Sequence, residues 1–198
     1  MNPEGSNFNP EFFSQKKETH SKSEKETPWE KKMAEVNEIV DSLGKKIDEN
    51  IKETVVAFSV HGFTTTASCE GHIAEKEEEQ HGLSYPWVEI CAPEPEGLSD
   101  AKKEEKNQLE QEWRIKNLKQ QRRMMDFLEE FYEKRKTPFD ARLVLEKIGA
   151  FGGFRVQSFG AEITEILSPE EKQQKLTLYQ KEIRDFTEFL KSKYFSKE

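Results

Sequence analysis

The side chains best suited to chemistry lie together between Thr64 and His72. This segment reads Thr-Thr-Thr-Ala-Ser-Cys-Glu-Gly-His, so it places hydroxyls, a thiol, a carboxylate and an imidazole within nine positions. The end of a strand, where the chain enters a loop, is where rigid folds commonly present functional groups. Gly71 permits a tight turn or the close approach of a ligand. Hydroxyls and backbone amides at such a strand end favour an anionic or polar ligand.

We therefore predict a binding module that holds a small polar ligand, or the anionic group of a partner, at the loop from Thr66 to His72. Trp87 and Glu89 would contact the same ligand from the next strand. The predicted ligand-binding residues are Thr66, Ser68, Cys69, Glu70, Gly71, His72, Trp87 and Glu89. The pattern leaves a purely structural interpretation open, in which the threonines favour a strand and Cys69 is a small core residue. It also leaves open whether any reaction is catalysed.

Soft metal ligands suggest a second alternative, a small zinc-binding domain. The candidate ligands are Cys69, His72, His81 and Cys91, separated by two, eight and nine residues. Two thiolates and two imidazoles form a tetrahedral zinc site when they converge on one point, which the loop between the two strands would have to arrange. A cysteine nucleophile at Cys69, with His72 or His61 as base and Glu70 orienting the imidazole, is a further alternative.

Four short motifs resemble those of a family of short uncharacterised proteins of phages and small-genome bacteria. They are Thr-x-Ser-Cys-Glu-Gly-His at 66–72, Tyr-Pro-Trp-Val at 85–88, Phe-Leu-x-x-Phe-Tyr at 127–132 and Phe-Arg-Val-Gln-Ser at 154–158. The resemblance covers roughly residues 33–165 and implies no assigned reaction.

A shorter segment is similar to the wybutosine-synthesis tRNA methyltransferases, whose signature is Thr-x-Ser-Ser-Cys-Ser-Gly-Arg. The matching residues are Thr65 or Thr66, Ser68, Cys69 and Gly71, whereas Glu70 replaces serine and His72 replaces arginine. This similarity implies an S-adenosylmethionine-dependent, RNA-modifying enzyme as the first alternative function. The missing arginine would be a natural partner for phosphate or carboxylate.

Composition narrows the classes of protein. The 198 residues carry a net charge of −8, 35% of them are charged, and two are cysteines. We find no apolar run long enough for a membrane span and no signal peptide, so we expect a cytoplasmic protein with reduced thiols. Basic residues cluster between Arg114 and Arg123, but acidic residues flank them in an acidic chain. Nucleic acid is therefore not the favoured partner, because such binding needs a sustained basic surface.

The pattern of apolar residues predicts a disordered tail over residues 1–26 and one domain over 27–198. Thr27-Pro28-Trp29-Glu30 and Ser168-Pro169-Glu170-Glu171 are capping boxes that start helices. An apolar stripe from Trp29 to Phe58 predicts a helix that Gly44 bends or splits.

Strands are predicted at 63–68, 85–92, 142–148 and 154–159, with a long charged helix from Ser99 to about Lys136. Two hairpin-like strand pairs, each followed by a helix, predict an α+β fold: an antiparallel sheet of about four strands with long helices packed on one face. Neither long helix keeps a strict heptad repeat over enough turns to predict an oligomeric state.

Overall fold

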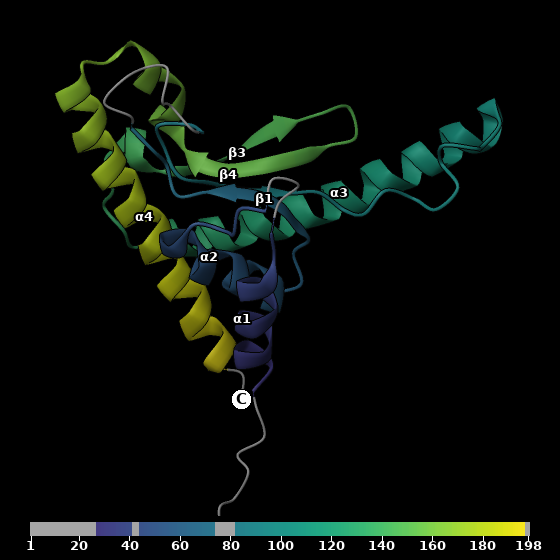
Figure 1. The fold of residues 1–198 in the computed structure, drawn as a ribbon, viewed down its shortest axis with the longest axis horizontal. Helices are drawn as coiled ribbons and strands as arrows, with labels where there is room; N and C mark the ends of the chain where they lie inside the picture. Colours follow the sequence, from purple (N-terminus) through teal and green to yellow (C-terminus); the bar gives the residue numbers. More distant parts are fainter. Residues whose placement is uncertain (1–26, 41–43, 74–81, 197–198) are drawn as a thin grey trace, which may run out of the picture.

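The computed structural model describes residues 27–40, 44–73 and 82–196. The predicted disordered tail lies outside these residues, and so does His81. The fold is α+β, as predicted: helices α1, α2, α3 and α4 surround one face of a four-stranded antiparallel sheet (Figure 1).

The first apolar stripe forms two helices, α1 (Pro28–Glu38) and α2 (Glu49–Val60). The capping box predicted at Thr27 and Glu30 is present. Gly44 adopts a φ of +75°, a left-handed conformation that ends helical geometry and favours glycine. The predicted split of the helix is therefore confirmed, but α1 already ends at Glu38, before Gly44, and Asp48 is the N-cap residue of α2.

The sheet has the strand order β1-β2-β4-β3, and every neighbouring pair is antiparallel. Its strands are β1 (Thr65–Cys69), β2 (Trp87–Ile90), β3 (Leu143–Ile148) and β4 (Gly153–Ser158). Both predicted strand pairs are adjacent in the sheet, and β2 joins β4 to connect them. Phe159 was predicted to end the last strand, but it begins the 3-10 helix η3 (Phe159–Ile166) instead.

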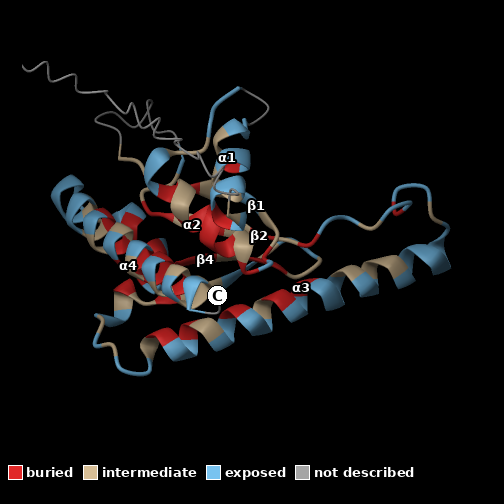
Figure 2. Ribbon diagram, turned by 90° about the horizontal axis from the view of Figure 1, so that it is seen from below, coloured by how far each residue is buried: buried red, intermediate tan, exposed pale blue. Residues whose placement is uncertain are grey.

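One face of the sheet forms the main core. Val88, Ile90, Phe154 and Val156 alternate with polar neighbours along β2 and β4, and all four are fully buried. They pack against apolar side chains of α1, α2, α3 and α4 (Figure 2). Alternation with a period of two thus gives β2 and β4 one apolar face for the helices and one polar face.

Helix α3 (Lys103–Tyr132) is shorter than predicted at both ends. Before it, residues 97–100 form turns that bury Leu98, so the helix starts after Ser99. Its first two turns carry exposed side chains and extend away from the core (Figure 2). The last helix, α4 (Pro169–Phe195), begins with the predicted capping box at Ser168 and Glu171. Among the described helices, none is long and apolar enough to cross a membrane.

Candidate metal centre

Three potential metal ligands from separate segments converge where β1 ends. Asp48 is the N-cap residue of α2, Cys69 is the last residue of β1, and His72 follows three positions later. One donor atom from each side chain lies within 4.8 Å of the other two. The His72 Nε2 atom lies 3.0 Å from the Asp48 Oδ2 atom. Sulfur, nitrogen and oxygen donors therefore share one small volume.

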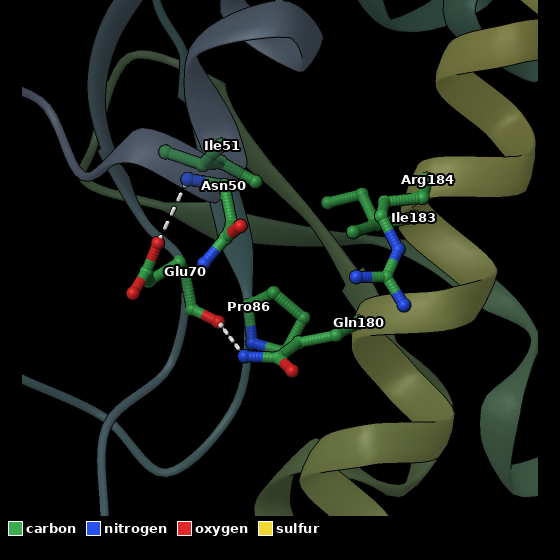
Figure 3. Close-up of a pocket in the computed structure, with 7 residues that line it drawn as sticks. All are labelled: Asn50, Ile51, Glu70, Pro86, Gln180, Ile183 and Arg184. Atoms are coloured by element: carbon green, nitrogen blue, oxygen red, sulfur yellow. Dashed lines mark hydrogen bonds between the residues drawn. The ribbon is translucent and has the colours of Figure 1, made fainter.

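The start of α2 and the loop after β1 are joined by two hydrogen bonds, in each of which a carboxylate of one segment accepts from a backbone N–H of the other. Asp48 does not cap its own helix; its Oδ2 atom accepts a hydrogen bond of 3.1 Å from the Glu70 backbone N–H. In return, the Glu70 carboxylate accepts a 2.9 Å hydrogen bond from the backbone N–H of Asn50, in the first turn of α2 (Figure 3). Glu70 thus caps α2 from outside the helix, and Asp48 is free to face Cys69 and His72.

Cys69 is 6% exposed, and its sulfur accepts hydrogen bonds from backbone amides. Burial raises the pKa of the Cys69 thiol; the amides of Gly71 and Leu83 lower it, and the negative charges of Asp48 and Glu70 raise it. Without a cation the thiol therefore keeps its proton. A bound dication would reverse this balance, because it stabilises the thiolate that the two amides already face.

Two glycines shape the loop around these donors. Gly71 has a φ of +86°, and a Cβ atom there would lie 2.6 Å from the Leu176 side chain and 2.8 Å from the Tyr85 backbone carbonyl carbon. Gly82 also has positive φ, and a Cβ atom there would lie 3.1 Å from the Cys69 sulfur. The backbone at Gly82 therefore lies directly against the donor cluster.

The side chains of Asp48 and His72 are 31% and 37% exposed, so the donor cluster opens to the surface. A separate hollow of about 300 Å³ lies between α2 and α4, lined in part by Asn50, Glu53 and Arg184. A smaller hollow beside it includes Glu70 and Gln180, whose side-chain amide donates to the Glu70 carbonyl (Figure 3). None of the three donor residues lines these two hollows.

The predicted residues on the sheet form a second group. Thr66 Oγ1 donates to the Glu89 carboxylate at 3.1 Å, and Arg155 pairs with the same carboxylate at 3.3 Å. The Arg155 guanidinium carbon lies 4.2 Å from the centre of the Trp87 ring. These side chains occupy the polar face of the sheet, where Thr66 and Arg155 satisfy the Glu89 carboxylate; the buried Trp87 indole N–H has no hydrogen-bond partner among the described residues. Ser68 lies opposite Val88, on the core-facing side, so the structure does not bring it to the Glu89 group.

The structure does not bring Cys91 together with Cys69 and His72. Cys69 pairs with Trp87 at the start of β2, whereas Cys91 follows the end of that strand and donates its amide to Thr64. Four residues of extended chain separate Trp87 from Cys91, or about 13 Å. His81, the fourth predicted ligand, lies outside the described residues, and its role stays a prediction.

The structure does not form the arrangement expected for a cysteine nucleophile at Cys69. Glu70 was expected to orient an imidazole, but its carboxylate caps α2, and Asp48 contacts His72 instead. His61 donates from Nε2 to the Leu190 carbonyl, which anchors α2 to α4. A buried thiol with a raised pKa is a poor nucleophile at neutral pH.

Sequence reasoning missed Asp48, because the continuous apolar stripe placed it inside a helix. A helix break predicted at Gly44 would have indicated Asp48. If the helix breaks there, the next residue able to cap a new helix is Asp48, at the end of Lys-Lys-Ile-Asp.

Comparisons of the chain with family models, with curated proteins and with solved structures give no match. The resemblances to the phage family and to the tRNA methyltransferases therefore stay predictions.

Proposed function

We propose that this chain is a zinc-binding α+β domain in which Asp48, Cys69 and His72 hold the ion, and that the ion binds a small polar or anionic ligand. The convergence of the three donor atoms within 4.8 Å carries the proposal. Tetrahedral ligands at about 2.0–2.3 Å from zinc lie about 3.3–3.8 Å from one another. The donors need only small movements to reach that spacing, with zinc replacing the proton between Asp48 and His72.

The donor types favour zinc over the common hard cations. Mg²⁺ and Ca²⁺ prefer oxygen ligands throughout, whereas thiolate and imidazole suit zinc. The carboxylates of Asp48 and Glu70 both oppose ionisation of Cys69, so they place negative charge near the site. Such charge attracts a dication. Backbone amides that hold the Asp48 carboxylate and the Cys69 sulfur provide the outer contacts that orient metal ligands.

The ligand would bind to the ion and not to the loop amides, because the amides already donate hydrogen bonds within the protein. The amides of Glu70, Gly71 and His72 already donate to Asp48, to Cys69 and to the Leu83 carbonyl. An anion beside these residues would also meet the Asp48 and Glu70 carboxylates. With three protein ligands from the described residues, a tetrahedral ion keeps one position for water or an anion.

Metal titration of the full chain tests the proposal. We expect one zinc per chain after purification without chelators, and an equally stoichiometric Co²⁺ complex with sulfur-to-cobalt charge-transfer absorption. Cys69→Ser should abolish that absorption, and Asp48→Asn and His72→Gln should each weaken binding at least about tenfold. Cys91→Ser is the matched control and should bind as the wild type does.

Circular dichroism of each variant separates loss of ligand from loss of fold. The proposal fails if folded wild-type protein binds no zinc, or if folded Cys69→Ser binds it unchanged. Adding azide to the Co²⁺ complex tests the ligand position, and we expect a shift of the visible bands. An unchanged spectrum would show that the coordination is closed and would remove the ligand-binding part of the proposal.

A further inference from the structure

Within the part of the chain that the structure describes, we consider two exposed apolar surfaces that the metal centre does not involve. The first, the η3 patch, consists of Phe139, Phe159, Ile163 and Ile166 on the 3-10 helices η2 (Phe139–Ala141) and η3. Phe139 is 67% exposed and Ile166 is 85% exposed, and the rings of Phe139 and Phe159 lie 4.5 Å apart. Contacting apolar side chains with this exposure commonly mark an interaction site.

The second surface, the α3 stripe, consists of Ile115, Leu118 and Met125, all at least 45% exposed. Their spacing of three and seven residues places them along one side of the helix. The opposite side packs into the protein through residues such as Asn117 and Met124, which are fully buried. The α3 stripe therefore faces away from the protein, and neither apolar surface covers the other within the chain.

The two surfaces have matching length and opposite charge. Ile115 to Met125 spans about 15 Å of α-helix, and Phe159 to Ile166 spans about 14 Å of 3-10 helix. The η3 patch is accompanied by the exposed carboxylates of Glu162 and Glu165. Residues 114–123 of α3 contain five basic residues and no acidic one. Exposed Lys119 and Arg122 thus accompany the Ile115–Leu118 part of the stripe, whereas the acidic Asp126 and Glu129 lie at its Met125 end, so the charge opposite to the η3 patch is offered by the first part of the stripe.

We propose that the chain associates with a second copy of itself, the η3 patch of one copy docking on the α3 stripe of the other. Because each copy carries both surfaces, two such contacts can form at once in a two-fold symmetric dimer. Few residues take part, and the contact depends on charge. The dimer is therefore weak and sensitive to salt. This inference does not depend on metal binding.

Paired charge reversals test the contact by sedimentation velocity of the full chain. Wild type should dimerise with increasing concentration at low salt and dissociate at high salt. The variants Glu162→Lys with Glu165→Lys and Lys119→Glu with Arg122→Glu should each raise the dimer Kd at least about tenfold. All four side chains are exposed, so the fold should persist.

An equimolar mixture of the two variants is the decisive sample, because every facing charge is again opposite. The mixture should dimerise, although each variant alone does not. Each double substitution changes the net charge of −8 by four units, so both variants stay negative and overall attraction cannot explain recovery. A wild type that stays monomeric at low salt, reversal variants that dimerise normally, or a mixture that stays monomeric would each overturn the proposal.

Discussion

The two cysteines lie near opposite ends of β2, and their surroundings differ in charge. Near Cys69 the contacts involve ionisable groups, Asp48 and His72. Near Cys91 the hydrogen-bonding groups are neutral, and Glu89 is the charge that acts on the thiol. Asn117 is fully buried, its side-chain N–H donates to the Phe151 carbonyl at 2.9 Å, and its oxygen accepts from the Ala92 amide at 2.6 Å.

Aromatic stacking completes the Cys91 end. The rings of Trp113 and Phe151 stack with centres 4.5 Å apart, and the Trp113 N–H donates to the Ala92 carbonyl. These contacts join α3 to the end of β2 and to the β3–β4 turn. The comparison indicates that neighbours, and not residue type, decide the role of a cysteine: Cys69 is the proposed metal ligand, and Cys91 packs among neutral side chains.

Gly71→Ala, next to Cys69, should produce the largest loss of stability. The substitution combines left-handed strain with collisions against backbone atoms, so we expect a loss of about 3–5 kcal/mol in the free energy of unfolding. Urea unfolding measures it. Gly97→Ala is the matched control, since Gly97 has a φ of +79° with nothing within 4 Å of its Cβ position. Its loss should be about 1–2 kcal/mol. Equal losses would contradict the proposed collision.

Asn117→Ala, next to Cys91, should lower the stability of the protein without changing the metal centre at Cys69. It leaves the buried Ala92 amide and the Phe151 carbonyl without partners, at about 1–3 kcal/mol each. We expect unfolding at lower urea and unchanged zinc stoichiometry in the folded protein. Gln108→Ala, on the exposed first part of α3, is the control and should cost little. Loss of zinc from folded Asn117→Ala would show that the two ends are not independent.

A pH series should give the smallest effect. Burial raises the pKa of both thiols, so the metal-free native state keeps protons that the unfolded chain releases above its thiol pKa of about 8.5. Stability should therefore fall as pH rises above about 8.5, by at most about 1.4 kcal/mol per pH unit for each thiol. Zinc bound by Cys69 would hold it as a thiolate, so the contribution of Cys69 to the loss of stability at alkaline pH should disappear.

Urea unfolding at pH 8, 9 and 10 provides the measurement. Zinc-loaded wild type should show the shallower pH dependence of metal-free Cys69→Ser, since Cys91 is the only thiol that titrates in both and the buried tyrosines, whose pKa values are also raised, contribute equally to both. If zinc leaves the alkaline slope of the wild type unchanged, Cys69 is not its ligand.

Local sequence signals predicted much of the fold, because capping boxes, Gly44 and strand alternation act over a few residues. Tertiary pairings were harder. The neighbours of Cys69 depend on Asp48, which joins the site only because α2 begins there and Glu70 replaces its cap. The distance between Cys91 and Cys69 was not evident either, because spacing along the chain does not show which end of a strand a residue occupies. The pairing of β2 with β4 was likewise not evident from either hairpin alone.

The most direct test of the central claim is zinc K-edge X-ray absorption on the zinc-loaded wild-type protein, because it counts the sulfur atoms bound to the ion. We expect one sulfur at about 2.3 Å from the zinc, with nitrogen and oxygen neighbours at about 2.0–2.2 Å. A spectrum with no sulfur neighbour, or with two, would contradict a centre built from Asp48, Cys69 and His72.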